Sequence, residues 1–353
     1  MRFNFTEDQL LLQQTVHEFL EGECTVEHVR RLWETDTGHS PEFWAKFAEI
    51  GVPGLLVPEA HDGLGMDEID LVLLLEEVGR AALPAPVIST ATVGVPLIAG
   101  TGSGELCERW LPKVAAGEAI LAVGHSVSPF VSDAHVADLL LLQNGEEVHA
   151  VAPADVKLTY QRSNDPSRRP FSVDWEPAEG TCVADGAEGN ALWAAALDRG
   201  ALGCAAQQLG VGQQLIDMAV DYACQRKQFG VPIGSFQAVK HMLANEKVRV
   251  DYARSVVYRA AHSVARGVAS RSVDVSAAKV AASEAAVSIA KTALQVHGAL
   301  GYTWEQDLHI WMRRAWSLDL AWGDGAWHRA RVADAVIDGT LSAETFGYSA
   351  PGA

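Results

Sequence analysis

The chain has 353 residues, of which 48% are hydrophobic and 20% charged, so it can bury a large core in one to three domains. Its formal net charge of −18 argues against nucleic acid or an anionic membrane surface as a general partner. The five cysteines are scattered, with no C-x-x-C pair and no histidine at metal-ligand spacing, so the sequence predicts a cytoplasmic protein with reduced thiols and no metal site. No run approaches the roughly 20 apolar residues of a membrane span, and the first residues lack the apolar segment of a secretion signal.

Residues 1–118 are predicted to form an N-terminal helical domain. Thr6 and Gln9 have the spacing of a capping box, and the apolar residues that follow recur at helical spacing. A connection rich in Gly and Pro over residues 51–65 separates two helical stretches, and Asp67 is placed to begin the second.

Residues 119–188 are predicted to form a short middle β domain. Here the pattern changes to brief apolar runs, rich in Val and Leu and broken by turn residues, as is typical of strands. These runs are Ile120–Val123, Leu139–Leu142, Val148–Val151 and Val156–Leu158.

Residues 189–353 are predicted to form a C-terminal helical bundle. Two long amphipathic stretches are separated by Pro232 and Gly234, and a third helix over residues 273–297 ends at Gly298. Helices, then a sheet, then more helices make an α+β order with the sheet in the middle.

Four segments carry a specific combination of motifs. They are Phe5–Gln9; Val57–Gly65 with Glu76–Arg80; Tyr222, Arg226, Gln228–Gly230, Ile233 and Phe236–Gln237; and Gln295–Tyr302 followed by Glu305. Together they resemble the acyl-CoA dehydrogenase family over both helical parts of the chain. The resemblance implies that family's fold, with an N-terminal helical domain, a middle β domain and a C-terminal four-helix bundle.

The resemblance also implies FAD as cofactor, shared between subunits. In the family, the two C-terminal motifs hold the ADP half of an FAD whose flavin lies in the neighbouring subunit. The residues that this assigns to cofactor binding are Arg226, Gln228, Phe229, Ile233, Gln237, Gln295, Gly298 and Ala299. The chemistry is consistent, because an arginine can bind a pyrophosphate with two hydrogen bonds and small residues allow close backbone approach. The alternative is that Arg226 caps a helix and Phe229 belongs to the core.

The position of the family's catalytic carboxylate is occupied by Trp322, whose indole cannot accept a proton. Some relatives place the base on an earlier helix, at a position that falls on Gly200 and Ala201 here. We therefore predict no catalytic residue in this chain. The family's flavin-binding loop is also absent, since Val123–Phe130 stands in its place and the next strand follows almost at once.

Four residues are candidates for a substitute base or a local structural role. Asp324 is two residues beyond Trp322, and we expect it to be a solvated loop residue. His297 is expected to pack at a helix end, whereas His125 and His328 have no identifiable partner in the sequence. Four further tryptophans are expected to join Trp322 in an aromatic cluster that fills a vacated pocket. They are Trp304, Trp311, Trp316 and Trp327.

The half-site that a subunit donates to its neighbour is thus retained, while the half-site that it would use itself is lost. This asymmetry predicts the non-catalytic subunit of an α2β2 acyl-CoA dehydrogenase. A catalytic partner would bind most of the acyl-CoA, an electron-transfer flavoprotein would be the acceptor, and bulky steroid side-chain acyl-CoAs are a substrate class by analogy. Two alternatives stay open: a self-sufficient homo-oligomeric flavoenzyme with a relocated base, and a cofactor-free scaffold.

Overall fold

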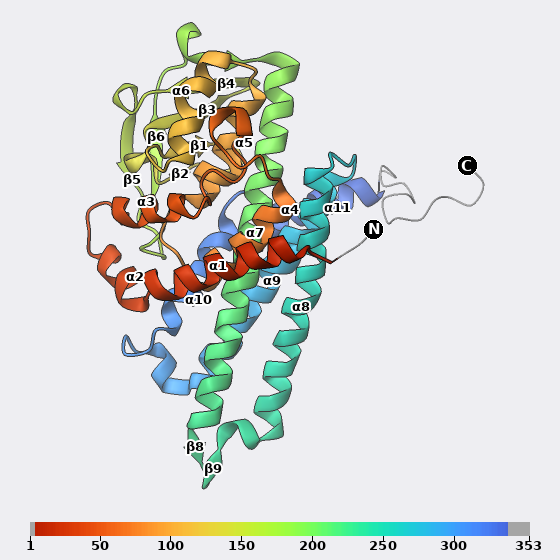
Figure 1. The fold of residues 1–353 in the computed structure, drawn as a ribbon. Coiled ribbons are helices and arrows are strands. Elements are labelled where there is room, and N and C mark those ends of the chain that lie inside the picture. The colour runs from red at the N-terminus through yellow and green to blue at the C-terminus, as the bar shows by residue number, and fades with distance from the viewer. Residues whose placement is uncertain (1–3, 338–353) are drawn as a thin grey trace, which may run out of the picture.

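A computed structural model describes residues 4–337, and its N-terminal part is helical as predicted (Figure 1). The helices are α1 (Glu7–Glu23), α2 (Val26–Trp33), α3 (Pro41–Glu49), α4 (Glu68–Arg80), α5 (Val95–Gly100) and α6 (Gly104–Ala115), with a 3-10 turn over Glu59–His61 and a π-helical stretch over Ile88–Gly94. The capping box of α1 is present, with the Thr6 amide 2.9 Å from Gln9 Oε1. Asp67 caps α4 as predicted.

The middle region contains two small sheets. The four-stranded sheet has the order β1 (Leu121–Gly124), β3 (Leu139–Asn144), β4 (Glu147–Val151), β7 (Cys182–Ala184), and only the β1–β3 pair is parallel. The three-stranded sheet has the order β2 (Val131–Ser132), β6 (Pro170–Asp174), β5 (Lys157–Tyr160). Short 3-10 turns lie between them, over Ala134–Val136, Pro153–Asp155 and Glu179–Thr181. All four predicted strands form, whereas β2, β6 and β7 were not predicted.

The C-terminal region is a bundle built around α7 (Gly186–Gln225), the long green helix of Figure 1. The other helices are α8 (Gln237–Ala265), α9 (Arg271–His297), α10 (Leu308–Leu320) and α11 (Gly325–Ile337), joined by the hairpin β8 (Lys227–Gln228) and β9 (Val231–Pro232) and by 3-10 turns over Ile233–Ser235 and Gly298–Tyr302. The apolar faces predicted for the first two long helices are buried along most of their length, and the third helix ends at Gly298 as predicted. The domain limits at residues 118 and 188 stay predictions.

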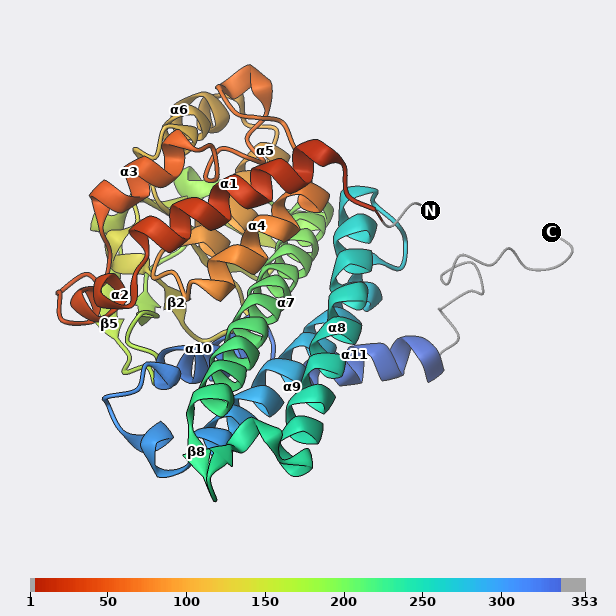
Figure 2. The ribbon, with the colours of Figure 1, turned by 60° about the horizontal axis from the view of Figure 1, so that its bottom comes forward.

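Helix α7 connects the regions of the molecule. It runs from beside the sheet to the β8–β9 hairpin at the bottom of Figure 1, and Figure 2 shows α4 crossing it. The two backbones touch, since a Cβ atom at Gly210 would lie 1.8 Å from the Glu76 carbonyl oxygen and one at Gly79 would lie 1.9 Å from that of Gln207. Only glycine fits at these two positions.

A buried ion pair joins α10 to the other two regions. Arg314 donates from Nε to Asp165 Oδ2 at 2.6 Å, and both side chains are almost fully buried. The same guanidinium donates to the carbonyl oxygens of Leu83 and Ala82 at 3.0 and 3.1 Å. A buried charge is tolerated because each of the three guanidinium nitrogens has a hydrogen-bond partner and one partner is an opposite charge. Within residues 4–337, no helix is both long and apolar enough to cross a membrane.

Candidate functional site

Trp322 and Gly200, the two positions where a base could stand, face each other in the fold. Trp322 lies in the loop between α10 and α11, and Gly200 lies within α7. A Cβ atom built on Gly200 would lie 2.2–2.5 Å from three ring atoms of the Trp322 indole, closer than any side chain can approach. The indole therefore occupies the space into which a side chain at position 200 would project, and the two replacements are parts of one contact.

The loop that presents Trp322 is held by buried polar groups. Lys279 on α9 donates from Nζ to the carbonyl oxygens of Leu318 and Asp319, both at 2.8 Å, at the C-terminal end of α10. Trp322 itself has φ of +58°, an unusual value for a bulky residue. His328 lies 2.9 Å from the Trp322 carbonyl oxygen, and burial lowers the pKa of His328 to about 4, so its neutral ring donates through Nε2. These contacts fix the backbone that aims the indole at α7.

A cavity of about 660 Å³ of empty space, partly open to solvent, lies beside Trp322. His125 lies against the indole, with ring centroids 5.8 Å apart, and burial lowers the pKa of His125 to about 4. The cavity has one carboxylate in its lining, that of Asp133, and burial raises the pKa of this group. Asp133 had no signal in the sequence, because it follows a two-residue strand and joins the lining of the cavity only through the fold.

One expectation about this region is confirmed and one is wrong. Asp324 is exposed in the loop, as expected, and it also accepts a hydrogen bond from the Trp327 amide at 2.8 Å, so it caps the start of α11 and lines a different groove. The predicted aromatic cluster is wrong, because only Trp322 among the five tryptophans lines the cavity. Trp311 is buried with its Nε1 on the Arg80 carbonyl oxygen, and Trp304 is 60% exposed beside Arg313. These rings come from α10, α11 and the loop before α10, and each has different neighbours.

A second groove, of about 710 Å³ and open to solvent, lies at the far end of α7. It is lined by Tyr222, Arg226, Gln228, Ile233, Val296, His297, Gly298, Ala299 and Leu300. Five of the eight residues predicted to bind the cofactor are in this lining, although they come from two segments about 70 residues apart. His297 is buried and stacks on Tyr222 at 4.3 Å between ring centroids, which matches its expected packing role.

The other three predicted residues lie around this groove. Phe229 is 94% exposed at the tip of the β8–β9 hairpin, so the alternative that it belongs to the core is wrong. Gln237 is exposed at the start of α8, and Gln295 is exposed on the last turn of α9. Arg226 ends α7 through its backbone, and no described residue forms a hydrogen bond or ion pair with its guanidinium. The groove thus offers an unpaired cation and an exposed aromatic ring to a ligand.

The cavity and the groove are too far apart to share one cofactor within a single chain. Gly200 and Gln225 are separated by 25 residues of continuous helix, which corresponds to roughly 37 Å at 1.5 Å per residue. An extended dinucleotide is shorter than this distance. A cofactor bound in the groove would therefore not reach the cavity of the same chain.

Comparison with known proteins identifies the family. The family model described as acyl-CoA dehydrogenase, N-terminal domain, matches residues 6–118, and the one described as acyl-CoA dehydrogenase, C-terminal domain, matches residues 187–337. The chain belongs to the acyl-CoA dehydrogenase family. Acyl-CoA dehydrogenase IpdE2 of Mycolicibacterium smegmatis is 33% identical over 313 residues, which cover 88% of this chain and 93% of the relative.

Solved structures share the fold over almost the whole chain. The ChsE4-ChsE5 complex from Mycobacterium tuberculosis matches with a TM-score of 0.85 and 25% identity, covering 96% of this chain and 99% of the other. A chain of the Tcur3481-Tcur3483 steroid acyl-CoA dehydrogenase, in its G363A variant, matches with a TM-score of 0.86 and 22% identity, covering 95% and 99%. The fold expected from the sequence motifs is confirmed.

Proposed function

We propose that this chain is the non-catalytic subunit of a heteromeric, FAD-dependent acyl-CoA dehydrogenase, which oxidises an acyl-CoA thioester between its α and β carbons. The observation that carries the proposal is the contact of the Trp322 indole with Gly200. It removes both positions from which the family draws its base, so α-proton abstraction would need a carboxylate from another chain.

The groove at the end of α7 supports the second half of the proposal. Arg226 would pair with the pyrophosphate of FAD, and Gln295 would form hydrogen bonds with the adenosine half. Gly298 has φ of +59°, and its missing side chain leaves room for the cofactor to approach the backbone. When bound, FAD accepts the hydride that leaves the β carbon. The catalytic partner would supply the base, the flavin cradle and most of the acyl-CoA contacts.

The substrate class and the partner are proposed from likeness. The ChsE4-ChsE5 and Tcur3481-Tcur3483 structures each contain two differently named chains, and the second is described as a steroid acyl-CoA dehydrogenase. We propose the same α2β2 organisation here, with a bulky, steroid-like acyl-CoA as substrate and an electron-transfer flavoprotein as electron acceptor. In such an assembly half of the ancestral sites are lost, which leaves room for a large acyl group.

The test compares the chain alone with the chain co-expressed with a complete acyl-CoA dehydrogenase subunit from the same genome. We expect stoichiometric flavin absorbance and acyl-CoA oxidation, followed with an artificial electron acceptor, only in the mixture. Alanine in place of the partner's own base should abolish the activity of the complex. Flavin bound stoichiometrically by the lone chain would overturn the proposal in favour of a homo-oligomeric flavoenzyme. Flavin in neither sample would favour a cofactor-free scaffold.

One observation favours the homo-oligomeric alternative: Asp133 lines the cavity beside Trp322 and brings a carboxyl group to it. A relocated base must reach the substrate from such a cavity, and a raised pKa brings a carboxyl group closer to the range useful for proton transfer. If the lone chain binds flavin and turns over acyl-CoA, Asp133→Asn should abolish turnover while Asp324→Asn leaves it unchanged. In the heteromer that we propose, Asp133→Asn should leave turnover unchanged as well.

A further inference from the structure

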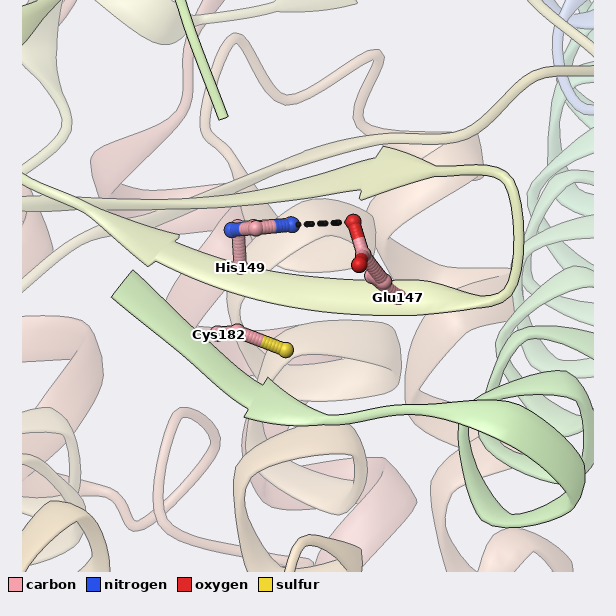
Figure 3. Close-up of side chains that lie close together, drawn as sticks. All are labelled: Glu147, His149 and Cys182. Atoms are coloured by element: carbon pink, nitrogen blue, oxygen red, sulfur yellow. Dashed lines mark hydrogen bonds and ion pairs between the residues drawn. The ribbon is translucent and has the colours of Figure 1, made fainter. Parts of the chain in front are cut away.

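Glu147, His149 and Cys182 bring three different ligand types together on one face of the four-stranded sheet. Glu147 and His149 are two residues apart on β4, and Cys182 is the register partner of His149 on β7 (Figure 3). One oxygen, nitrogen or sulfur atom from each side chain lies within 4.8 Å of the others. Residues two apart on a strand and residues directly opposite on a neighbour share a face, so this grouping is set by the sheet itself.

The hydrogen bonds around His149 direct one ring nitrogen toward the carboxylate. Thr181 Oγ1 donates to the Ala178 carbonyl oxygen at 2.9 Å and lies 2.9 Å from His149 Nδ1. With the hydroxyl proton on that carbonyl oxygen, Oγ1 accepts from Nδ1–H, and this tautomer leaves Nε2 free to bind a cation. The Nε2 atom lies 3.0 Å from Glu147 Oε2. A divalent cation bound by both atoms fits this separation.

Neighbouring residues hold the side chains of Glu147 and His149 in defined orientations. Asn144 Nδ2 donates to Glu147 Oε2 at 2.6 Å, which fixes the carboxylate, and Trp175 packs against the His149 ring at 5.1 Å between centroids. His149 is buried, whereas the Glu147 side chain is 42% exposed. Hydrogen bonds from a second layer of residues to the ligating side chains are typical of metal sites.

We propose that Glu147, His149 and Cys182 bind a zinc-type divalent cation, with water at the fourth, exposed position. Imidazole, thiolate and carboxylate together suit Zn²⁺, which prefers four ligands in a tetrahedral arrangement. Its bond lengths require about 3.6 Å between sulfur and nitrogen, so the half-buried Cys182 sulfur atom has to move inward by no more than about 1 Å. Coordination releases the thiol proton to solvent, and the thiol gives up only a 3.5 Å contact to the Ala184 carbonyl oxygen.

The ion would join the sheet to the bundle. It would clamp β4 to β7, the strand that leads directly into α7, at a point where Trp193 of α7 already donates from Nε1 to the Glu147 carbonyl oxygen at 3.0 Å. None of the three ligands lines the Trp322 cavity or the Arg226 groove, so the site is independent of the proposed function. The sequence predicted no metal site, because 32 residues separate His149 from the opposing Cys182.

The test uses the full chain, stripped of metal with a chelator and titrated with Co²⁺ and then Zn²⁺. We expect one equivalent of Co²⁺ to give a thiolate-to-cobalt charge-transfer band in the near ultraviolet, and Zn²⁺ to displace it and raise the thermal unfolding midpoint. Cys182→Ser should abolish the band and weaken Zn²⁺ binding at least about tenfold. The matched control Cys224→Ser removes an exposed cysteine at the end of α7 and should leave both readouts unchanged.

A second variant, Glu147→Gln, tests the site independently of whether the Cys182→Ser chain folds. Glu147→Gln keeps the shape of the side chain and removes its charge, so it should retain the unfolding midpoint of the metal-free chain while weakening Zn²⁺ binding at least about tenfold. Absence of the band in the wild-type chain, or a band that persists in Cys182→Ser, would overturn the site. In that case His149 Nε2 simply forms a hydrogen bond with Glu147.

Discussion

The two ends of helix α7 differ in burial and in the side chains that surround them. Near Gly200 the helix is buried, and the space beside it is filled by the Trp322 indole. At Arg226 the helix ends in solvent, and the groove there keeps an unpaired guanidinium and an aromatic ring that is 94% exposed. In the function that we propose, the end near Gly200 has lost its catalytic role because its pocket is filled, while the Arg226 end of the same helix keeps a surface that serves another chain.

The largest effect is expected from breaking the buried ion pair between Asp165 and Arg314, which lines the cavity beside Trp322. Asp165→Ala leaves the Arg314 charge buried without its ionic partner and should lower the free energy of unfolding by about 3–5 kcal/mol. The matched control is Glu284→Ala, since the ion pair of Glu284 with Arg329 is exposed and should contribute less than about 1 kcal/mol. Denaturant unfolding of the lone chain measures both, and a loss under 1 kcal/mol for Asp165→Ala would contradict the assignment.

At the Arg226 end of α7, removal of a charged side chain should weaken cofactor binding and leave the stability of the lone chain almost unchanged. Arg226→Ala removes a charge-assisted contact to the pyrophosphate and should weaken FAD binding to the assembled complex by about 1.5–3 kcal/mol, or roughly 10–150-fold. The unfolding free energy of the lone chain should change by less than about 0.5 kcal/mol. Lys227→Ala, next to it in the hairpin, serves as the control. Unchanged flavin affinity in the Arg226 variant would make this arginine a structural residue.

A double-mutant cycle tests whether Trp322 and Gly200 form one unit. Gly200→Ala should destabilise the chain by about 1–3 kcal/mol, because the new methyl group meets the indole. In a Trp322→Ala background the same change should be neutral or stabilising by up to about 1 kcal/mol, as alanine favours helix. The coupling energy comes from unfolding free energies of the four proteins. Equal effects of Gly200→Ala in both backgrounds would show that the two positions are not energetically coupled.

The smallest predicted effect is the pH dependence of stability that arises from His328, which contacts the Trp322 carbonyl oxygen. Burial lowers the pKa of His328 to about 4, below its ordinary 6.5, so the stability that the neutral ring provides is complete above pH 6.5 and is lost as the pH falls toward 4. Between pH 7 and 5.5 this amounts to about 1 kcal/mol. His328→Asn lacks this part, so its stability deficit relative to wild type should shrink by that amount over the same interval. A deficit that is constant with pH would show that His328 does not titrate as proposed.

The parts of the fold that local chemistry determines were predictable. The Thr6 capping box and the Leu139–Leu142 strand depend on neighbours in the sequence, and both form. Strand β2 was missed because it has only two residues, and β7 because its three residues show no alternating pattern. The predicted tryptophan cluster failed for a related reason, since closeness in the sequence does not decide which face of α10 a ring occupies.

In the site itself, motif spacing predicted which residues would gather, and packing decided the rest. The groove brings Arg226 and Gly298 together from two motifs, as their joint occurrence suggested. By contrast, the contacts of His125 and His328 with Trp322 depend on tertiary structure and had no signal in the sequence. The same holds for Gly200, whose lack of a side chain is explained only by the indole that lies on it.

The Trp322–Gly200 contact also makes the loss of the base hard to reverse in evolution. With the indole in place, any carboxylate introduced at position 200 would collide with three ring atoms before it could be selected for activity. That route back to catalysis requires Trp322 to be replaced first, by a change that brings no activity of its own and removes packing from a half-buried loop. In the function that we propose, the residue that replaced one ancestral base therefore closes the position of the other, and a lineage carrying this pair depends on a partner chain for its chemistry.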